Sequence, residues 1–257
     1  MDYRLRYYFC AYDSHETVAA DGVSMLDGKA GGVGRKFLDH QNKLVTRLSP
    51  VGRQLNSKDE TTLNINCVIL AWFEQVYRSR GHVWPALDIL LRQATVEGLI
   101  SGVQLDMVQD ISQLSSAFAA DAKGLFKPDP ILNPMFEGSP DVGGADADMI
   151  IDKTLIEFKC TLKLEAPELR KYALQLLGYV LLDYGGEYAV SDLLVHLPRQ
   201  RFSWRMPLWK LVLAPQVVQE ILKRGDTPEA EEVSEQLRKR RLEFRTVAKS
   251  LQLGSYI

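Results

Sequence analysis

The chain of 257 residues contains few cysteines and few histidines. Cys10, Cys67 and Cys160 are too dispersed for a disulfide framework or a structural zinc site, because both need paired spacings. We expect all three to be small buried hydrophobic residues. The four histidines likewise form no metal-binding spacing, so each is expected to be a surface or packing residue.

The sequence also lacks an excess of charge of one sign and any long apolar run. Its formal net charge is −2, so a nucleic-acid surface would need local clusters of lysine and arginine. No apolar run reaches the length of a transmembrane helix, and the N-terminus has no signal-peptide hydrophobic region. We therefore expect a cytoplasmic protein without a membrane partner. A composition of 46% hydrophobic and 25% charged residues excludes the disordered and collagen-like classes.

A glycine-rich stretch over residues 28–36 lacks the spacing of a Walker A loop and predicts no ATPase. We expect it to be a flexible basic loop. Helical periodicity is present in residues 61–78, 85–96 and 103–120, which indicates a largely helical N-terminal region.

The most informative stretch covers residues 143–159, whose alternating pattern predicts a β-hairpin with its turn at Asp152 and Lys153. Antiparallel pairing about that turn sets Asp148 opposite Glu157. The polar side chains then share one face, which we expect to be solvated while the apolar face packs. The members of the polar face are Asp146, Asp148, Glu157 and Lys159, and those of the apolar face are Ala147, Met149, Ile151, Ile156, Phe158 and Cys160.

Two carboxylates about 5 Å apart across a strand pair can together hold a hard divalent cation such as Mg²⁺ or Mn²⁺. The cation can make a water molecule a usable nucleophile, and Lys159 can orient that water and neutralise charge on a phosphorane. The alternative is an ordinary solvated hairpin face, on which each cross-strand pair contributes only about 0.2–1 kcal/mol.

These residues resemble the core of the PD-(D/E)XK nuclease superfamily. Asp148 takes the place of the first acid, with Asp146 as a competing candidate, and Glu157 and Lys159 form the E-x-K pattern. Downstream, Gln175 and Tyr179 resemble the Q-x-x-x-Y motif of the RecB-like branch and share one helix face. Taken alone, the last two residues are better explained as a polar pair on an amphipathic helix, and their position just after the hairpin favours the functional interpretation.

The resemblance implies an α/β fold with a restriction-endonuclease-like αβββαββ core. We expect a mostly helical region over residues 1–100, the nuclease core over 101–212 and a helical C-terminal segment over 213–257. In the core, the helix at 103–120 would come first. The edge strand 136–139, the hairpin, a helix at 167–184 and strands at 188–197 and 202–208 would follow it.

The resemblance further implies a Mg²⁺- or Mn²⁺-dependent deoxyribonuclease that hydrolyses phosphodiester bonds in DNA repair or in defence against foreign DNA. Asp148 and Glu157 would hold the metal, with Asp146 as a further ligand, and Lys159 would position the water. Gln175 and Tyr179 would brace the site. Some RecB-like relatives hold an iron–sulfur cluster with four cysteines, which a chain with three cannot supply.

Basic residues elsewhere are candidates for contact with nucleic acid. Arg199, Arg201 and Arg205, near Trp204, lie beside the last expected strands. The C-terminal stretch 227–249 reads as a helix that runs from acidic to basic, a pattern that matching to the helix dipole also explains.

Two other functions remain open from the sequence. The chain can be a DNA-binding or assembly subunit whose cleavage is absent or gated by a partner ATPase or helicase. It can also be a helical interaction module that carries an unrelated hairpin.

Overall fold

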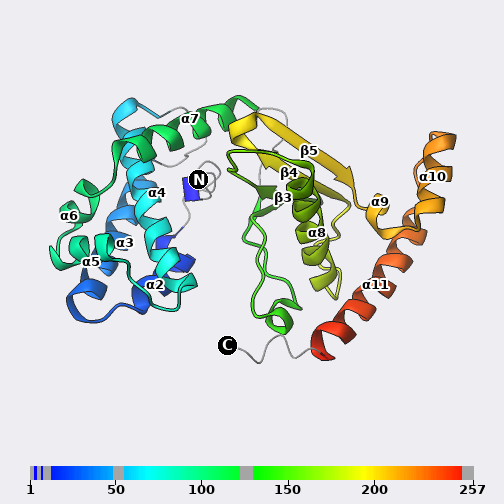
Figure 1. Cartoon of the computed structure of the whole chain (residues 1–257), viewed down its shortest axis with the longest axis horizontal. Coiled ribbons are helices and arrows are strands. Elements are labelled where there is room, and N and C mark those ends of the chain that lie inside the picture. Colours follow the sequence, from blue (N-terminus) through cyan, green and yellow to red (C-terminus); the bar gives the residue numbers. More distant parts are fainter. Residues whose placement is uncertain (1–2, 5–6, 8–12, 49–54, 122–129, 251–257) are drawn as a thin grey trace. The chain divides into compact units, whose positions relative to one another are not determined.

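A computed structural model describes residues 3–4, 7, 13–48, 55–121 and 130–250 of the chain (Figure 1). The chain divides into two compact units, Met1–Ala122 and Lys123–Ile257, which are called here the helical unit and the sheet unit. This division lies at residue 122, whereas the sequence predicted boundaries at residues 100 and 212. Within the described residues, no helix is both long enough and apolar enough to cross a membrane.

In the part of the helical unit that the structure describes, one short 3₁₀ turn and six α-helices have defined bounds. They are η1 (Ser14–Glu16), α2 (Val18–Ser24), α3 (Gly28–Leu48), α4 (Ser57–Arg78), α5 (Pro85–Arg92), α6 (Val96–Ser101) and α7 (Leu105–Asp121). The predicted helix at 61–78 is confirmed within α4, and the one at 103–120 is confirmed from Leu105 in α7. The stretch 85–96 is helical only to Arg92, because a turn at residues 93–95 separates α5 from α6. Asn56 caps α4 by accepting a hydrogen bond from the Asp59 amide at 2.9 Å, which satisfies a donor at the helix start.

Two predictions for this unit need correction. Residues 28–36 form the first turns of α3 rather than a flexible loop. Gly31 and Gly34 allow the helix to pack closely on neighbouring parts of the chain, because a larger side chain at either position would collide with them. The helix at 103–120 corresponds to α7, but α7 packs against α4 of the helical unit. It is therefore not placed as the first helix of the sheet unit.

The sheet unit is built on a five-stranded mixed sheet with strand order β1-β2-β3-β4-β5. The strands are β1 (Ile131–Leu132), β2 (Met149–Ile151), β3 (Thr154–Phe158), β4 (Asp192–Leu197) and β5 (Phe202–Pro207). β3 and β4 are parallel, and the other neighbours are antiparallel. The predicted hairpin is confirmed, because Met149 pairs with Ile156 and Ile151 with Thr154.

The hairpin turn has the backbone that the sequence required. Asp152 and Lys153 both have positive φ, at 49° and 63°, which matches the type I′ turn that suits the twist of two antiparallel strands. The predicted edge strand at 136–139 is wrong. The edge strand is β1, and residues 139–142 form the 3₁₀ helix η3 (Ser139–Val142).

Helix α8 (Ala166–Leu182) connects the parallel strands β3 and β4 and packs on the sheet (Figure 1). Parallel neighbours need a crossover connection of this kind, which covers one face of the sheet. The core between them is apolar and includes Leu155, Leu176, Val180, Leu193 and Val195. Every residue of β2 and β3 is buried, so both faces of the hairpin are covered, and α8 covers the face that bears Leu155.

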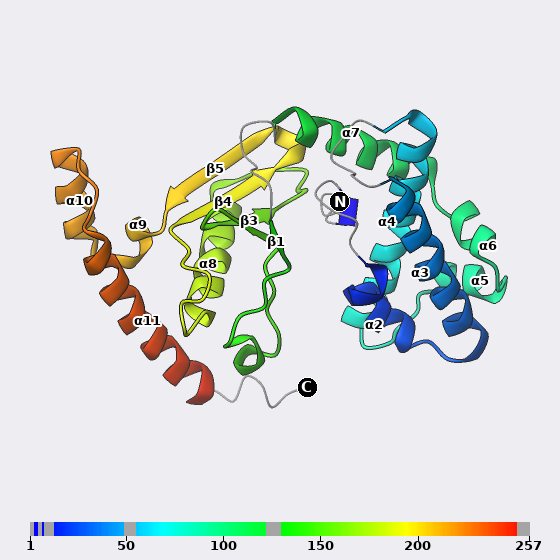
Figure 2. The same ribbon diagram turned by 180° about the vertical axis from the view of Figure 1, so that it is seen from behind.

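The C-terminal elements are η4 (Pro198–Gln200), α9 (Trp209–Val212), α10 (Pro215–Arg224) and α11 (Ala230–Ser250). The predicted C-terminal helix is confirmed in α11, which runs past α9 and α8 (Figure 2). The Arg241 guanidinium in α11 donates to the Val180 carbonyl at 3.1 Å and to Asp183 Oδ2 at 3.0 Å. These bonds fix α11 to the end of α8.

Candidate active site

Two aspartates, Asp146 and Asp148, lie just before the first residue of β2. The last paired residues of β2 and β3 at this end of the hairpin are Met149 and Ile156, and Asp148 is the next residue beyond them. Asp148 Oδ2 accepts a hydrogen bond of 2.7 Å from the Phe158 amide, so its carboxylate is held against β3. Asp146 forms an isolated antiparallel bridge with Met135. Both aspartates are half-buried.

Glu157 is buried, with only 4% of its surface exposed. The expectation of a solvated polar face is therefore wrong for this residue. Side chains alternate along a strand, so Glu157 points to the same side as Leu155, and that side is covered by α8. The sequence pattern of the hairpin could not reveal this cover, because it depends on the parallel pairing with β4.

A buried carboxylate requires hydrogen-bond partners. Two partners of Glu157 come from different parts of the chain, one just after β3 and one in α8. Its Oε1 accepts from Lys159 Nζ at 2.6 Å and from Gln175 Nε2 at 3.1 Å. Gln175 Nε2 also donates to the Tyr179 hydroxyl oxygen at 2.7 Å. A single network thus joins four of the residues that the sequence singled out: Glu157, Lys159, Gln175 and Tyr179.

The pKa of the Tyr179 hydroxyl depends on its burial and on the acids around it. Burial is the main cause that raises the pKa of its hydroxyl well above the ordinary value, and the negative charge of Glu157 adds to it. Asp148 and Asp146 raise this pKa further, while the hydrogen bond from Gln175 lowers it. The three acids therefore act on the same hydroxyl, which stays protonated at neutral pH.

Two aromatic residues at the site were not found from the sequence. Lys159 Nζ lies 5.4 Å from the ring centroid of Tyr172, which is within range of a cation–π contact. Phe136 stacks on Tyr179, with ring centroids 5.6 Å apart and planes 13° from parallel. Tyr172 lies one helical turn before Gln175, so helical spacing was an available signal. Phe136 comes from the connection after β1 and gave no such signal.

The predicted nucleic-acid-binding arginines lie around β5. Arg199 is in η4 and Arg201 follows it with a φ of 50°. Arg205 is exposed, pairs with Asp192 Oδ1 at 3.3 Å and also donates to Thr154 Oγ1 at 3.3 Å. The register pairs Glu157 with Val195 and Val195 with Trp204, so Arg205 points to the face opposite Glu157. Their role in binding remains a prediction.

The chemistry of the donor set fits a hard divalent cation. Asp148 and Glu157 offer carboxylate oxygens at the ends of neighbouring strands, which are ligands that Mg²⁺ and Mn²⁺ prefer. The Lys159 ammonium neutralises Glu157 at a position where a cation would do the same. Within the described part of the chain, no group of three or more histidine, cysteine, aspartate or glutamate side chains is arranged to hold a metal ion.

The cysteines differ in part from the expectation that all are buried. Cys67 is buried, whereas Cys160 is exposed just after β3, where the strand has ended and the alternation no longer applies. Cys10 lies outside the described residues.

Comparisons of the chain with models of protein families, with curated proteins and with solved structures found no match. The chemistry of the residues themselves is therefore the basis for a functional conclusion.

Proposed function

We propose that the chain is a divalent-metal-dependent nuclease that hydrolyses phosphodiester bonds in DNA, with its active centre at the end of the β2–β3 hairpin. One observation carries this proposal. The buried Glu157 carboxylate is held by both Lys159 and Gln175, and Asp148, which directly precedes β2, is held against β3 by the Phe158 amide. Acids and a lysine clustered in a largely buried setting at a strand end are costly to stability and typical of a functional centre.

Asp148 and Glu157 would hold the cation, and Asp146 would be a further ligand. Bound there, Mg²⁺ or Mn²⁺ would supply Lewis acidity at the scissile phosphate. Gln175 orients Glu157 by donating to its Oε1, while the Phe158 amide orients Asp148. Both carboxylates are thus preorganised by the backbone and by α8, which lowers the cost of arranging them on binding.

Lys159 supplies a positive charge next to Glu157. It has 24% of its side chain exposed, lies 2.6 Å from Glu157 Oε1 and rests near Tyr172. The ammonium can turn from Glu157 to an incoming phosphate, neutralise charge there and orient a water by donating to it. Tyr179 remains protonated because its pKa is raised, so it acts as a hydrogen-bonding brace and not as a base.

A second function from a different class is also favoured by an observation. Glu157 Oε1 is occupied by Lys159 and Gln175. A subunit whose centre becomes competent only when a partner ATPase or helicase, or DNA itself, displaces Lys159 would have this arrangement. Metal binding without cleavage by the chain alone would favour this second function.

The proposal is tested with the variant Asp148→Asn, which keeps the side-chain size and removes the charge. We expect metal-dependent DNA cleavage to fall by at least about 100-fold, the order of loss for one electrostatic group of a catalytic centre. Asp192→Asn is the matched control, because Asp192 lies in the same sheet on the face opposite Glu157. Asp146→Asn decides between the two candidate acids. Equal cleavage by Asp148→Asn, Asp192→Asn and the wild type would refute the proposed centre.

A further inference from the structure

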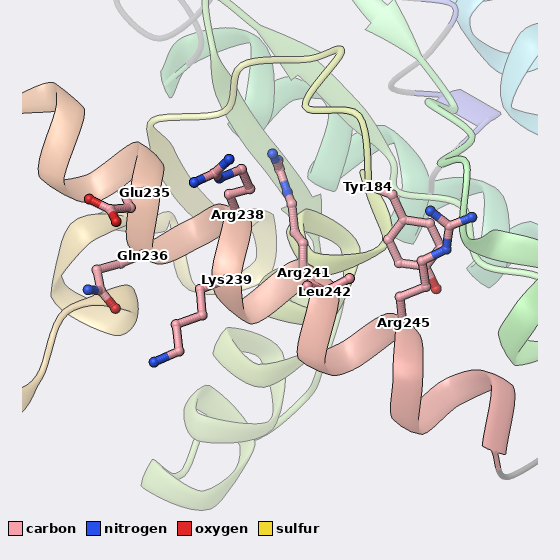
Figure 3. Close-up of a pocket in the computed structure, with 8 residues that line it drawn as sticks. All are labelled: Tyr184, Glu235, Gln236, Arg238, Lys239, Arg241, Leu242 and Arg245. Atoms are coloured by element: carbon pink, nitrogen blue, oxygen red, sulfur yellow. The ribbon is translucent and has the colours of Figure 1, made fainter.

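A groove of about 610 Å³ lies along α11 in the sheet unit, outside the proposed catalytic centre (Figure 3). Its volume is in the range of sites that bind a small organic molecule or one unit of a polymer. The groove is lined by residues within 235–245 of α11 and by Tyr184, which follows the end of α8. We call it the α11 groove.

One end of the α11 groove has a flat aromatic and apolar surface. The Arg245 guanidinium lies over the Tyr184 ring, 4.9 Å from its centroid, and the two side chains are adjacent in Figure 3. The Tyr184 hydroxyl donates to Asp141 Oδ2 at 2.9 Å, which fixes the ring. Leu242 is 67% exposed beside them. A planar ligand can therefore stack or pack against this end of the groove.

The charges of the groove divide into structural and available ones. Arg241 is structural, because its side chain is only 11% exposed and pairs with Asp183. Arg238 and Lys239 are exposed and have no ion-pair partner among the residues that the structure describes. Arg245 approaches Glu137 only at 4.0 Å. Glu235 lies at the end away from Tyr184, and Arg238 and Lys239 lie between Glu235 and the flat surface (Figure 3).

We propose that the α11 groove binds single-stranded nucleic acid, with phosphates on Arg238 and Lys239 and a base against Tyr184, Arg245 and Leu242. Cations beside an aromatic and guanidinium surface suit a strand whose bases are unstacked. A duplex offers phosphates but keeps its bases stacked inside, so it would leave the flat surface unused. An acidic peptide would satisfy the charges but supplies no planar group for Tyr184 and Arg245.

This inference goes beyond the proposed hydrolysis and does not depend on it. Binding at the groove involves no residue of the Glu157 network and requires no divalent cation. It is therefore measured in EDTA, where a metal-dependent centre is inactive. A protein that binds in EDTA but never cleaves would refute the proposed function alone, and one that cleaves without binding at the groove would refute this inference alone.

The experiment measures fluorescence anisotropy with a labelled oligothymidylate of roughly 20 nucleotides, longer than one typical binding site. Oligouridylate and a duplex of the same length are the comparison probes. The variant is Arg238→Gln/Lys239→Gln, and the matched control is Lys223→Gln/Arg224→Gln, an adjacent pair of exposed cations in α10. Both double variants change the net charge by the same amount, so a general loss of positive charge cannot distinguish them.

We expect the groove variant to bind oligothymidylate about tenfold more weakly, and its salt dependence to fall by a slope of about 1.4, or 0.7 for each lost phosphate contact. The control should bind as the wild type does. The oligouridylate arm assigns the strand as DNA, RNA or either. Equal loss in both double variants, tighter binding of the duplex, or no binding of either single strand would overturn the proposal.

A second pair of variants tests the flat surface. Tyr184→Phe keeps the ring and removes the bond to Asp141, whereas Tyr184→Leu removes the ring. We expect Tyr184→Leu to weaken binding about tenfold, on the scale of one lost base–aromatic stack, and Tyr184→Phe to bind nearly as the wild type. Thermal melting checks that both variants are folded. Equal affinity of the folded Leu and Phe variants would contradict the role of the ring.

Discussion

Replacing Lys159 with methionine should destabilise the fold as well as affect catalysis. The side chains of Lys159 and Glu157 are 24% and 5% exposed, and their charged atoms are 2.6 Å apart. At an effective dielectric constant near 20, the gross attraction at this distance is about 6 kcal/mol. Desolvation and the partial exposure of Lys159 offset part of it. We therefore expect Lys159→Met to lower the free energy of unfolding by about 2–4 kcal/mol at neutral pH in EDTA.

The free energy of unfolding is measured by calorimetric melting. Hydrogen exchange of the hairpin amides then reports the stability of the sheet unit by itself. Lys163→Met is the matched control, because Lys163 is exposed and should change stability by less than about 0.5 kcal/mol. In the double variant Glu157→Gln/Lys159→Met the buried charge is gone, so the two losses should not add. Additive losses, or a Lys159→Met protein as stable as the wild type, would refute the coupling between these side chains.

The remaining predictions concern tyrosine titration and the anchor of α11. Burial is the main cause that raises the pKa of Tyr184 from the ordinary 10 to about 12, and the hydrogen bond to Asp141 adds to it. The stability that this group contributes is therefore fully present below about pH 10 and is lost as the pH rises towards 12. Alkaline denaturation of wild type and Tyr184→Phe checks this, and identical pH dependence would contradict it. Arg241→Met should cost about 3–5 kcal/mol, because it leaves the buried Asp183 charge unpaired, whereas Arg224→Met should cost less than about 1 kcal/mol at an exposed pair. Urea unfolding of the two variants measures this contrast, and equal losses would contradict it.

The hairpin could be predicted from sequence because its signals are local. Alternation along residues 146–151 and 154–160 sets the faces, and Asp152 with Lys153 adopts the positive φ that a two-residue turn needs. The helix with Gln175 and Tyr179 was predicted within one or two residues of its ends, because its apolar residues recur at helical spacing. Helical spacing also placed Gln175 and Tyr179 on one face of this helix, in agreement with the hydrogen bond between their side chains.

The features that sequence reasoning missed depend on long-range packing. Glu157 is buried because β3 pairs in parallel with β4 and α8 crosses over both, and no local pattern in the hairpin encodes that cover. The edge strand β1 has only two residues, too few to show a period. Helix α7 has an amphipathic pattern that fits either unit, and its contact with α4 determines where it packs.

The central claim is tested most directly by incubating the chain with linear and closed-circular DNA in Mg²⁺, in Mn²⁺ and in EDTA, with Lys159→Ala and Lys163→Ala beside the wild type. We expect cleavage by the wild type and by Lys163→Ala that requires metal and disappears in Lys159→Ala. Degradation of linear DNA only would identify an exonuclease, and opening of the circle an endonuclease. Metal-dependent cleavage that persists undiminished in folded Lys159→Ala would contradict the account.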